Sequence, residues 1–249
     1  MSGHSKWSSI KHKKAATDAK RGKVFTKLIR EITVAAKMGG EDPSANPRLR
    51  AAIQSARGQN MPMDTVNRAI KKGAGGNDGL DYEEVIYEGF GPSNVAVVIS
   101  ALTDNRNRTI ASIRTAFNKF NGTLGSPNSV LHMFDRKGTL QIEKSVVDED
   151  TLTEVILEAG AEDLDTSGED YLVISEIDAF EEVKSALEEK GWPIKEAQLS
   201  QLPHSRTIIS DREDAEKVMN FLDMLEEDDD IQRIFTNFDI DDAILAELS

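Results

Sequence analysis

Apolar residues recur at helical spacing in three short stretches of the first 75 residues. These stretches cover residues 24–36, 49–56 and 66–70, and within each the apolar positions lie three or four residues apart. Such spacing places the apolar side chains on one face of a helix. Asn46-Pro47 precedes the second stretch, in the usual order of an N-cap residue followed by a proline at the first helical position. The pattern predicts a bundle of three amphipathic helices.

Beyond residue 80, short apolar strands alternate with amphipathic helices. Strands are predicted at residues 84–90, 95–102, 130–134, 139–143, 171–175, 197–199, 207–209 and 231–235, and helices near residues 110–120, 152–156, 180–187 and 215–225. Turns are predicted at Gly91-Pro92 and Lys137-Gly138, and a hairpin is predicted across Ser167-Gly168. Between residues 139 and 199 the order β-α-β-β-α-β is that of a ferredoxin-like unit.

The predicted fold class is α+β with three domains: an N-terminal three-helix domain followed by two ferredoxin-like α+β domains. The glycine-rich stretch 73–79 is interpreted as a flexible linker after the helices. The strand–helix–strand elements after Pro203 can complete the unit that begins near Val95, so the third domain is predicted to be inserted into the second. The predicted boundaries are residues 1–75, residues 80–134 plus 203–249, and residues 135–202.

The composition is that of a globular protein without disulfides. The mean hydropathy is −0.43, and apolar runs such as residues 95–99 are far shorter than the ~20 residues that span a bilayer. The N-terminus is basic but lacks the apolar core of a secretory signal. The absence of cysteine excludes a disulfide framework, a thiolate zinc site and a cysteine nucleophile. We therefore expect a cytoplasmic protein with no membrane partner.

Charge is divided unevenly along the chain. Residues 1–72 contain sixteen Lys and Arg against five Asp and Glu, a net charge of +11, whereas residues 73–249 carry −25. The overall charge of −14 hides this division. A protein that concentrates its positive charge at one end can present that end to a polyanion while the rest stays in solution. The division therefore favours nucleic acid as a partner.

The candidate nucleic-acid-binding residues lie mainly in the basic arm and on the first predicted helix. On that helix Lys23, Lys27, Arg30 and Lys37 project on the side opposite the apolar stripe. Each phosphate that such cations contact releases counterions and adds salt-dependent affinity; the alternative is an ordinary solvated lysine face. The full candidate set is Lys6, Trp7, Lys11, His12, Lys13, Lys14, Lys20, Arg21, Lys23, Lys27, Arg30, Lys37, Arg106 and Arg108.

Three features each allow two interpretations. Trp7 can stack on a base or, as we favour, anchor the arm against its own domain. Arg106 and Arg108 flank a predicted helix N-terminus, where they are either solvated neighbours of a cap residue or a second anion contact. The acidic run 226–230 can hold Mg²⁺, but it lies between a helix and a strand, where acidic solvated loops are ordinary. We interpret that run as structural.

No catalytic constellation is present in the sequence. His4 and His12 have neither a cysteine nor a nearby carboxylate with which to hold a metal. The glycines of residues 73–79 fit neither a dinucleotide-binding motif nor a P-loop. The chain has no serine elbow, and the spacing of its acids selects no catalytic pair. We expect a protein that is not an enzyme and that uses no metal, cofactor or small-molecule substrate.

Several ordered motifs resemble the YebC family. They are GHSKW, IKHKKAATDAKRGKVFTKLIREI, NPRLRAAI, NMP, AIKKGAGG, YEGFGP and LTDNRNRT, and the match extends over nearly the whole chain. The resemblance implies a cytoplasmic protein with a helical N-terminal domain and two α+β domains, usually described as a probable DNA-binding transcriptional regulator. It also implies a link to translation, because members include a mitochondrial translational activator of cytochrome oxidase subunit I and bacterial factors associated with ribosome passage through proline runs.

The residues and the resemblance favour different nucleic acids. DNA regulation calls for a helix that reads bases, often on a dimer, and the sequence has no helix-turn-helix signature and no dimerisation heptads. Binding to ribosomal RNA requires only a complementary shape, contacts to phosphates and a few stacked bases. The ribosome is therefore a possible partner. The residues therefore favour RNA, whereas the family description favours DNA. A third possibility is an interaction module whose acidic domains bind a protein and whose arm contacts no nucleic acid.

Overall fold

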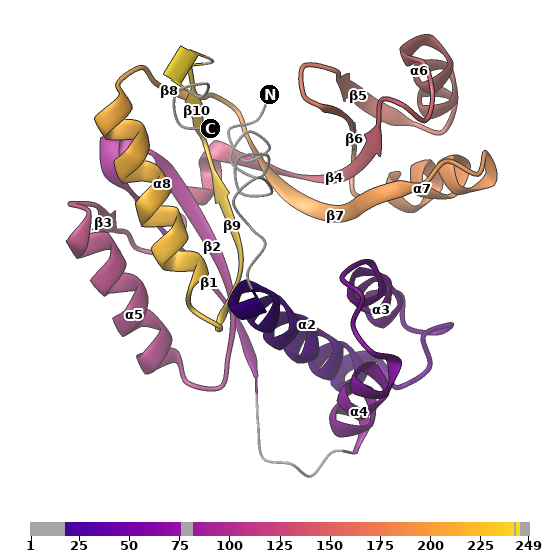
Figure 1. Ribbon diagram of the computed structural model, residues 1–249, viewed down its shortest axis with the longest axis horizontal. Coiled ribbons are helices and arrows are strands. Elements are labelled where there is room, and N and C mark those ends of the chain that lie inside the picture. Colours follow the sequence, from indigo (N-terminus) through magenta and orange to yellow (C-terminus); the bar gives the residue numbers. More distant parts are fainter. Residues whose placement is uncertain (1–17, 76–81, 242, 245–249) are drawn as a thin grey trace.

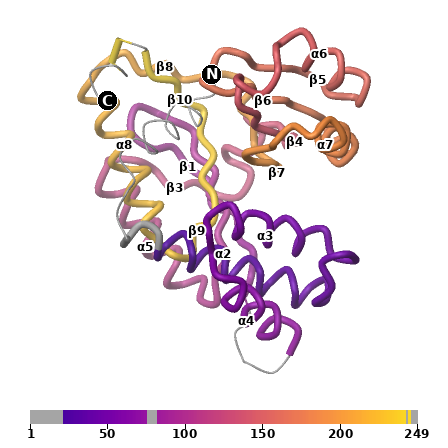
Figure 2. The backbone as a smooth tube through the Cα atoms, turned by 45° about the vertical axis from the view of Figure 1, so that its right-hand side comes forward, coloured from indigo at the N-terminus to yellow at the C-terminus, as the bar shows by residue number. Residues whose placement is uncertain are grey.

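The computed structural model describes residues 18–75, 82–241 and 243–244 (Figure 1). Within these ranges the fold is α+β, with seven α-helices, two four-stranded antiparallel sheets and a two-stranded parallel sheet. Figures 1 and 2 show three lobes: a helical lobe, a first sheet lobe with α5 and α8, and a second sheet lobe with α6 and α7. None of the described helices is both long enough and apolar enough to cross a membrane.

The helical lobe consists of α2 (Asp18–Gly39), α3 (Pro47–Gly58) and α4 (Met63–Ala74). A Cβ atom on Gly73 would lie 2.2 Å from the carbonyl oxygen of Thr33, so this glycine lets α4 approach the backbone of α2. The three predicted apolar stripes meet in one core: Ile32, Ala35, Ala36, Leu49, Ala52, Ile53, Ala56, Met61, Val66 and Ala69.

Asn46 fixes the junction between the first two helices. Its side chain accepts a hydrogen bond from the Leu49 amide at 3.0 Å, which confirms the predicted N-cap. The same side chain donates to the carbonyl oxygens of Ala35 at 2.7 Å and Gly40 at 2.9 Å. One buried residue therefore begins α3 and satisfies carbonyl groups at the end of α2.

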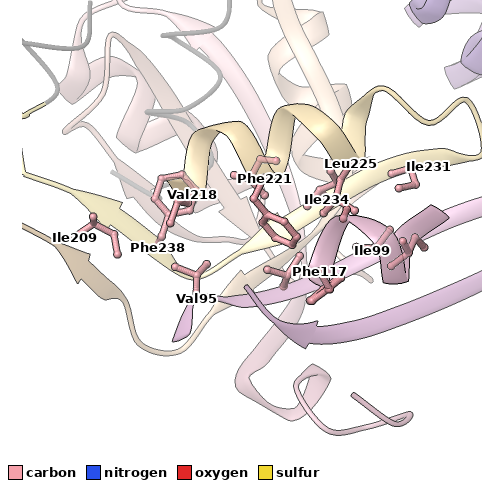
Figure 3. Close-up of a cluster of buried hydrophobic side chains, with 14 of the residues drawn as sticks. Val95, Ile99, Phe117, Ile209, Val218, Phe221, Leu225, Ile231, Ile234 and Phe238 are labelled. Atoms are coloured by element: carbon pink, nitrogen blue, oxygen red, sulfur yellow. The ribbon is translucent and has the colours of Figure 1, made fainter. Parts of the chain in front are cut away.

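The first sheet lobe has the strand order β3-β1-β2-β9, and α5 and α8 cover one of its faces (Figures 1 and 3). Strand β1 lies between β2 and β3, so β2-α5-β3 is a split βαβ unit. Figure 3 shows the core, in which the rings of Phe117 and Phe221 meet edge to face at 5.0 Å. The elements are β1 (Glu83–Phe90), β2 (Ala96–Thr103), α5 (Arg106–Lys119), β3 (Thr123–Leu124), β8 (Thr207–Ile209), α8 (Arg212–Glu226), β9 (Ile231–Thr236) and β10 (Phe238–Ile240), with β8 and β10 paired in parallel.

The opposite face of this sheet is covered by residues 130–134, which were predicted to be a strand. That prediction is wrong for all but the last residue, because Leu131–Met133 form a 3₁₀ turn and only Phe134 belongs to a strand, β4. The buried carboxylate of Glu88 accepts hydrogen bonds from the amides of Asn128, Val130 and Leu131 at 2.6 to 2.8 Å. These amides donate to a side chain, so they are not available to donate to a neighbouring strand, and the segment does not pair as a strand.

The second sheet lobe lies between β3 and β8 in the chain and has the strand order β5-β6-β4-β7. Its elements are β4 (Phe134–Glu143), α6 (Glu149–Glu158), β5 (Ala161–Asp165), β6 (Asp170–Ser175), α7 (Phe180–Glu189) and β7 (Ile194–Pro203). This is the predicted β-α-β-β-α-β order, so the α+β class with one sheet unit inserted into another is confirmed. The domain boundaries themselves stay a prediction.

The predicted turn at Lys137-Gly138 is wrong, since both residues lie inside the continuous strand β4. A Cβ atom on Gly138 would lie 2.4 Å from the Phe180 ring and 2.6 Å from the Ser175 hydroxyl oxygen. The glycine therefore makes room for α7 on the sheet. Strand β7 is also longer than the predicted 197–199, because it pairs with β4 along nearly its whole length.

Candidate nucleic-acid interface

The N-terminal part of helix α2 lies near the loop between α8 and β9 (Figure 2). Part of its basic stripe contacts that loop. Lys23 Nζ donates to the carbonyl oxygen of Glu227 at 3.2 Å, and Lys27 Nζ donates to that of Glu226 at 3.0 Å. The last carbonyl groups of a helix have no partner within it and carry the negative end of its dipole. These lysines therefore stabilise the C-terminus of α8.

Arg30 continues the same contact one turn further along α2. Its guanidinium donates to the carbonyl oxygen of Asp229 at 2.8 Å and to the Asp230 carboxylate at 2.5 Å. The guanidinium also lies 5.6 Å from the centre of the Tyr82 ring, within the range of a cation–π contact. Only 16% of the Arg30 side chain is exposed, so little of it faces solvent in this arrangement.

Asp230 is the centre of this contact and is 2% exposed. Besides Arg30, its carboxylate accepts hydrogen bonds from Arg108 at 2.7 and 2.9 Å, from the Thr109 hydroxyl at 2.7 Å and from the Thr103 hydroxyl at 3.2 Å. A buried carboxylate is tolerated only when it is paired and hydrogen-bonded in this way. The four partners come from α2, β2 and α5, so one side chain joins the helical lobe to the first sheet lobe.

Burial and hydrogen bonding act on the pKa of Asp230 in opposite directions. Burial raises it, because it disfavours the charged form, whereas hydrogen bonds from Thr109, Arg108 and Arg30 lower it. The hydrogen bonds outweigh burial, so the pKa of Asp230 lies below its ordinary value. The side chain is therefore a carboxylate at neutral pH, and its contacts with both arginines are charge-assisted.

Arg106 and Arg108 begin α5 but have different partners. The cap is Asn105, whose side chain accepts from the Arg108 amide at 3.1 Å. Arg106 forms an exposed ion pair with Glu83 at 2.6 Å, whereas the Arg108 guanidinium points to Asp230. The geometry supports a structural role for Arg108, and an anion contact at this helix start stays a prediction.

The two arginines are therefore expected to differ in their effect on stability. Arg106→Ala removes an exposed pair and should change the free energy of unfolding by less than about 0.5 kcal/mol. Arg108→Ala removes hydrogen bonds to a buried carboxylate and should cost about 1–2 kcal/mol. Urea denaturation of the two single variants checks this, and equal midpoints would contradict the structural role of Arg108.

The other predicted site residues are less well defined by the structure. Lys37 lies exposed in the last turn of α2. Lys20 and Arg21 belong to α2, but only their backbone is described. The remaining candidates lie outside the described residues: Lys6, Trp7, Lys11, His12, Lys13 and Lys14.

Basic residues on α3 and α4, which were not among the predicted site residues, form a further group. Arg50, Arg57 and Lys71 line a groove of about 650 Å³ on the helical lobe. Arg57, Lys71 and the neighbouring Lys72 are exposed, and within the described ranges their side chains form no hydrogen bond or ion pair. The helical period could have revealed them, because positions 50, 53, 54 and 57 share one face of α3.

The acidic run 226–230 contains no metal-binding cluster. Its backbone carbonyls bind cations of α2, and its buried carboxylate faces arginines. In the part of the chain that the structure describes, no group of His, Asp and Glu is arranged to hold a metal ion.

Comparison with known proteins covers the whole length of the chain. Residues 5–76 match the family described as the TACO1/YebC protein N-terminal domain, and residues 82–238 match the TACO1/YebC second and third domain. A probable transcriptional regulatory protein of Desulforapulum autotrophicum is 52% identical over 98% of both chains. One of Geobacter sulfurreducens is 50% identical over 100% of both. The crystal structure of a conserved hypothetical protein from Aquifex aeolicus has a TM-score of 0.83 at 47% identity, covering 90% of this chain and 92% of that one.

Proposed function

This chain belongs to the TACO1/YebC family, and we propose that it is a regulator of gene expression that binds nucleic acid through its N-terminal segment, residues 1–75. Related proteins bear the name probable transcriptional regulatory protein, and no catalytic step is part of the proposal. The proposal places the protein in the cytoplasm.

The observation that carries the proposal is the division of charge. A net charge of +11 over residues 1–72 stands against −25 over the rest. Clustered cations on one segment are the electrostatic footprint of a nucleic-acid-binding protein. The acidic lobes would repel a phosphate backbone, so any nucleic acid must approach from the basic end.

The described cations of this end fall into two groups. Lys23, Lys27 and Arg30 already bind the loop between α8 and β9, so each would have to exchange a partner before it could contact a phosphate. Arg57 and Lys71 have no such partner among the described residues. We infer that the arm and the groove face of α3 and α4, which carries Arg50, Arg57 and Lys71, make the first contacts. The α2 stripe becomes available only when the helical lobe leaves the loop.

DNA and RNA are both candidate ligands. The name of the relatives favours DNA. The groove on α3 and α4 favours RNA, because it joins cations to apolar side chains and is of a size for one unstacked base. Sequence-specific recognition of RNA largely targets such unpaired, splayed-out bases. Binding to duplex DNA, single-stranded DNA and single-stranded RNA, measured side by side, separates these ligands.

The proposal predicts a steep salt dependence. If the arm and the helical lobe contact five to eight phosphates, the slope of log K against log salt on duplex DNA should be about −4 to −7. Changing Lys11, Lys13 and Lys14 together to Gln should flatten the slope by roughly 2 to 3. Fluorescence anisotropy at a series of salt concentrations measures both quantities.

A matched control removes the same charge elsewhere. Arg114, Lys184 and Lys190 lie in the sheet lobes, and changing all three to Gln should leave the slope unchanged. A wild-type slope near zero would refute electrostatic binding of nucleic acid and leave the protein-interaction alternative. An equal effect of the two triple variants would show that total charge, rather than the basic segment, governs binding.

A further inference from the structure

We propose that the groove between α3 and α4 is a binding site for one unpaired nucleotide of a single-stranded nucleic acid. The base would lie on the apolar floor of the groove, and its flanking phosphates would contact the basic rim. The inference rests on the proposed function and adds to it a defined place on the helical lobe and a chemical class of ligand.

The groove is formed by two aligned helical stripes. Arg50, Ile53, Gln54 and Arg57 line it from α3, and Met63, Asn67, Ile70 and Lys71 line it from α4, while Glu41 and Pro43 come from the preceding loop. Each stripe has the three- and four-residue spacing of one helix face. The volume of about 650 Å³ lies within the ~300–1,000 Å³ of small-ligand sites, which is sufficient for one nucleotide.

The rim has an excess of available positive charge. Arg57 and Lys71 form no ion pair or hydrogen bond within the described residues. Arg50 is held by the carbonyl oxygens of Pro43 at 3.1 Å and Ser44 at 3.3 Å, both through one nitrogen of its guanidinium. The other N–H groups of Arg50 remain to donate to a phosphate. Glu41 is the single acid in the lining, so the cations outnumber it in a chain whose overall charge is −14.

The floor of the groove suits the face and the edge of a base. Met63 is 41% exposed, and Ile70, which also lines the groove, is half-buried. A methionine thioether contacts aromatic rings favourably. Gln54 and Asn67 are exposed amides that offer donors and acceptors to the edge of a base. Apolar surface, amides and cations together fit a nucleotide better than they fit inorganic phosphate, because phosphate has no apolar face to contact the floor of the groove.

The test uses the full-length chain and a fluorescein-labelled 12-nucleotide single-stranded RNA of mixed sequence. The variant Arg57→Gln with Lys71→Gln removes two cations of the rim, and Arg68→Gln with Lys72→Gln removes the same charge from α4 outside the groove lining. We expect the rim variant to weaken binding about tenfold or more and the control about twofold or less. Met63→Ala, which changes no charge, should weaken binding about threefold or more. Circular dichroism melts of all three variants establish that they fold.

A second measurement locates the contact directly. RNA that carries 4-thiouridine should crosslink on irradiation to a peptide within residues 50–71, and an excess of poly-glutamate should not prevent it. Equal crosslinking with thiothymidine-labelled single-stranded DNA would support the site with DNA as the source of the nucleotide.

The outcomes separate this inference from the proposed function. If the rim variant and its control bind equally well while wild-type binding keeps its salt dependence, the groove site is refuted and the proposed function stands. If poly-glutamate competes as well as RNA does, the groove is a docking site for an acidic peptide and the inference fails. If the wild-type protein binds no nucleic acid under any condition, both fail together.

Discussion

Replacing Asp230 with alanine is expected to lower the free energy of unfolding by about 3 kcal/mol. The change removes the partner of Arg30 and Arg108 and leaves the buried hydroxyl of Thr103 without its acceptor. The buried hydroxyl of Thr109 loses one acceptor but keeps the carbonyl oxygen of Asn105 at 3.1 Å. Unpaired buried polar groups cost about 1–3 kcal/mol each, and the loss is limited because Arg108 is half-exposed and can regain water. Urea denaturation monitored by circular dichroism measures the change.

The neighbouring residue provides the control. Asp229 contributes its backbone carbonyl to Arg30, and that group survives a change of side chain. Asp229→Ala removes the same formal charge and should change the free energy of unfolding by less than about 0.5 kcal/mol. Hydrogen exchange should show the loss in Asp230→Ala at α2 and at the start of α5. If both variants have wild-type stability, Asp230 does not join the two lobes.

The same carboxylate should make stability depend on pH in the acid range. Its folded-state pKa lies below the ordinary value of 3.8, so its contribution is complete above that value and is lost as the pH falls through the folded pKa. The difference in unfolding free energy between the wild type and Asp230→Asn should therefore be constant above about pH 5 and shrink below about pH 4. A difference that grows on acidification would contradict the lowered pKa.

Removing the N-terminal segment is expected to abolish nucleic-acid binding. A chain of residues 82–249 keeps both sheet lobes with their own apolar cores, so it should still melt cooperatively. It loses every cation of the +11 segment and keeps a strongly acidic remainder. Because binding to a phosphate backbone is mainly electrostatic, affinity for DNA and RNA should fall by at least about a hundredfold at 100 mM salt.

Anisotropy titrations of the shortened and full-length chains measure this loss. The shortened chain also lacks α2, which binds the α8–β9 loop in the full-length chain. Its melting temperature should therefore be lower than that of the full-length chain. Unchanged affinity in the shortened chain would place the nucleic-acid contact on the acidic lobes and refute the assignment to residues 1–75.

Local patterns in the sequence were sufficient to predict most of the elements. The three helices, the cap at Asn46 and the order of strands and helices depend on the spacing of neighbours along the chain, and the structure has them. Two of the errors have a long-range cause. Gly138 was interpreted as a turn, but it accommodates Phe180 from α7, and residues 130–134 turn because Glu88 binds their amides.

The candidate site depended still more on the tertiary structure. The sequence alone determined that positive charge gathers in the first 72 residues, because charge is a property of composition. It did not determine which cations are already engaged. Arg30 and Arg108 meet Asp230 across 200 and 122 residues of chain, and no periodicity encodes such a pairing. Helical spacing fixes the face on which a side chain lies, but only the packing of the lobes decides what that face meets: the acidic loop for α2, and open solvent for the basic groove of α3 and α4.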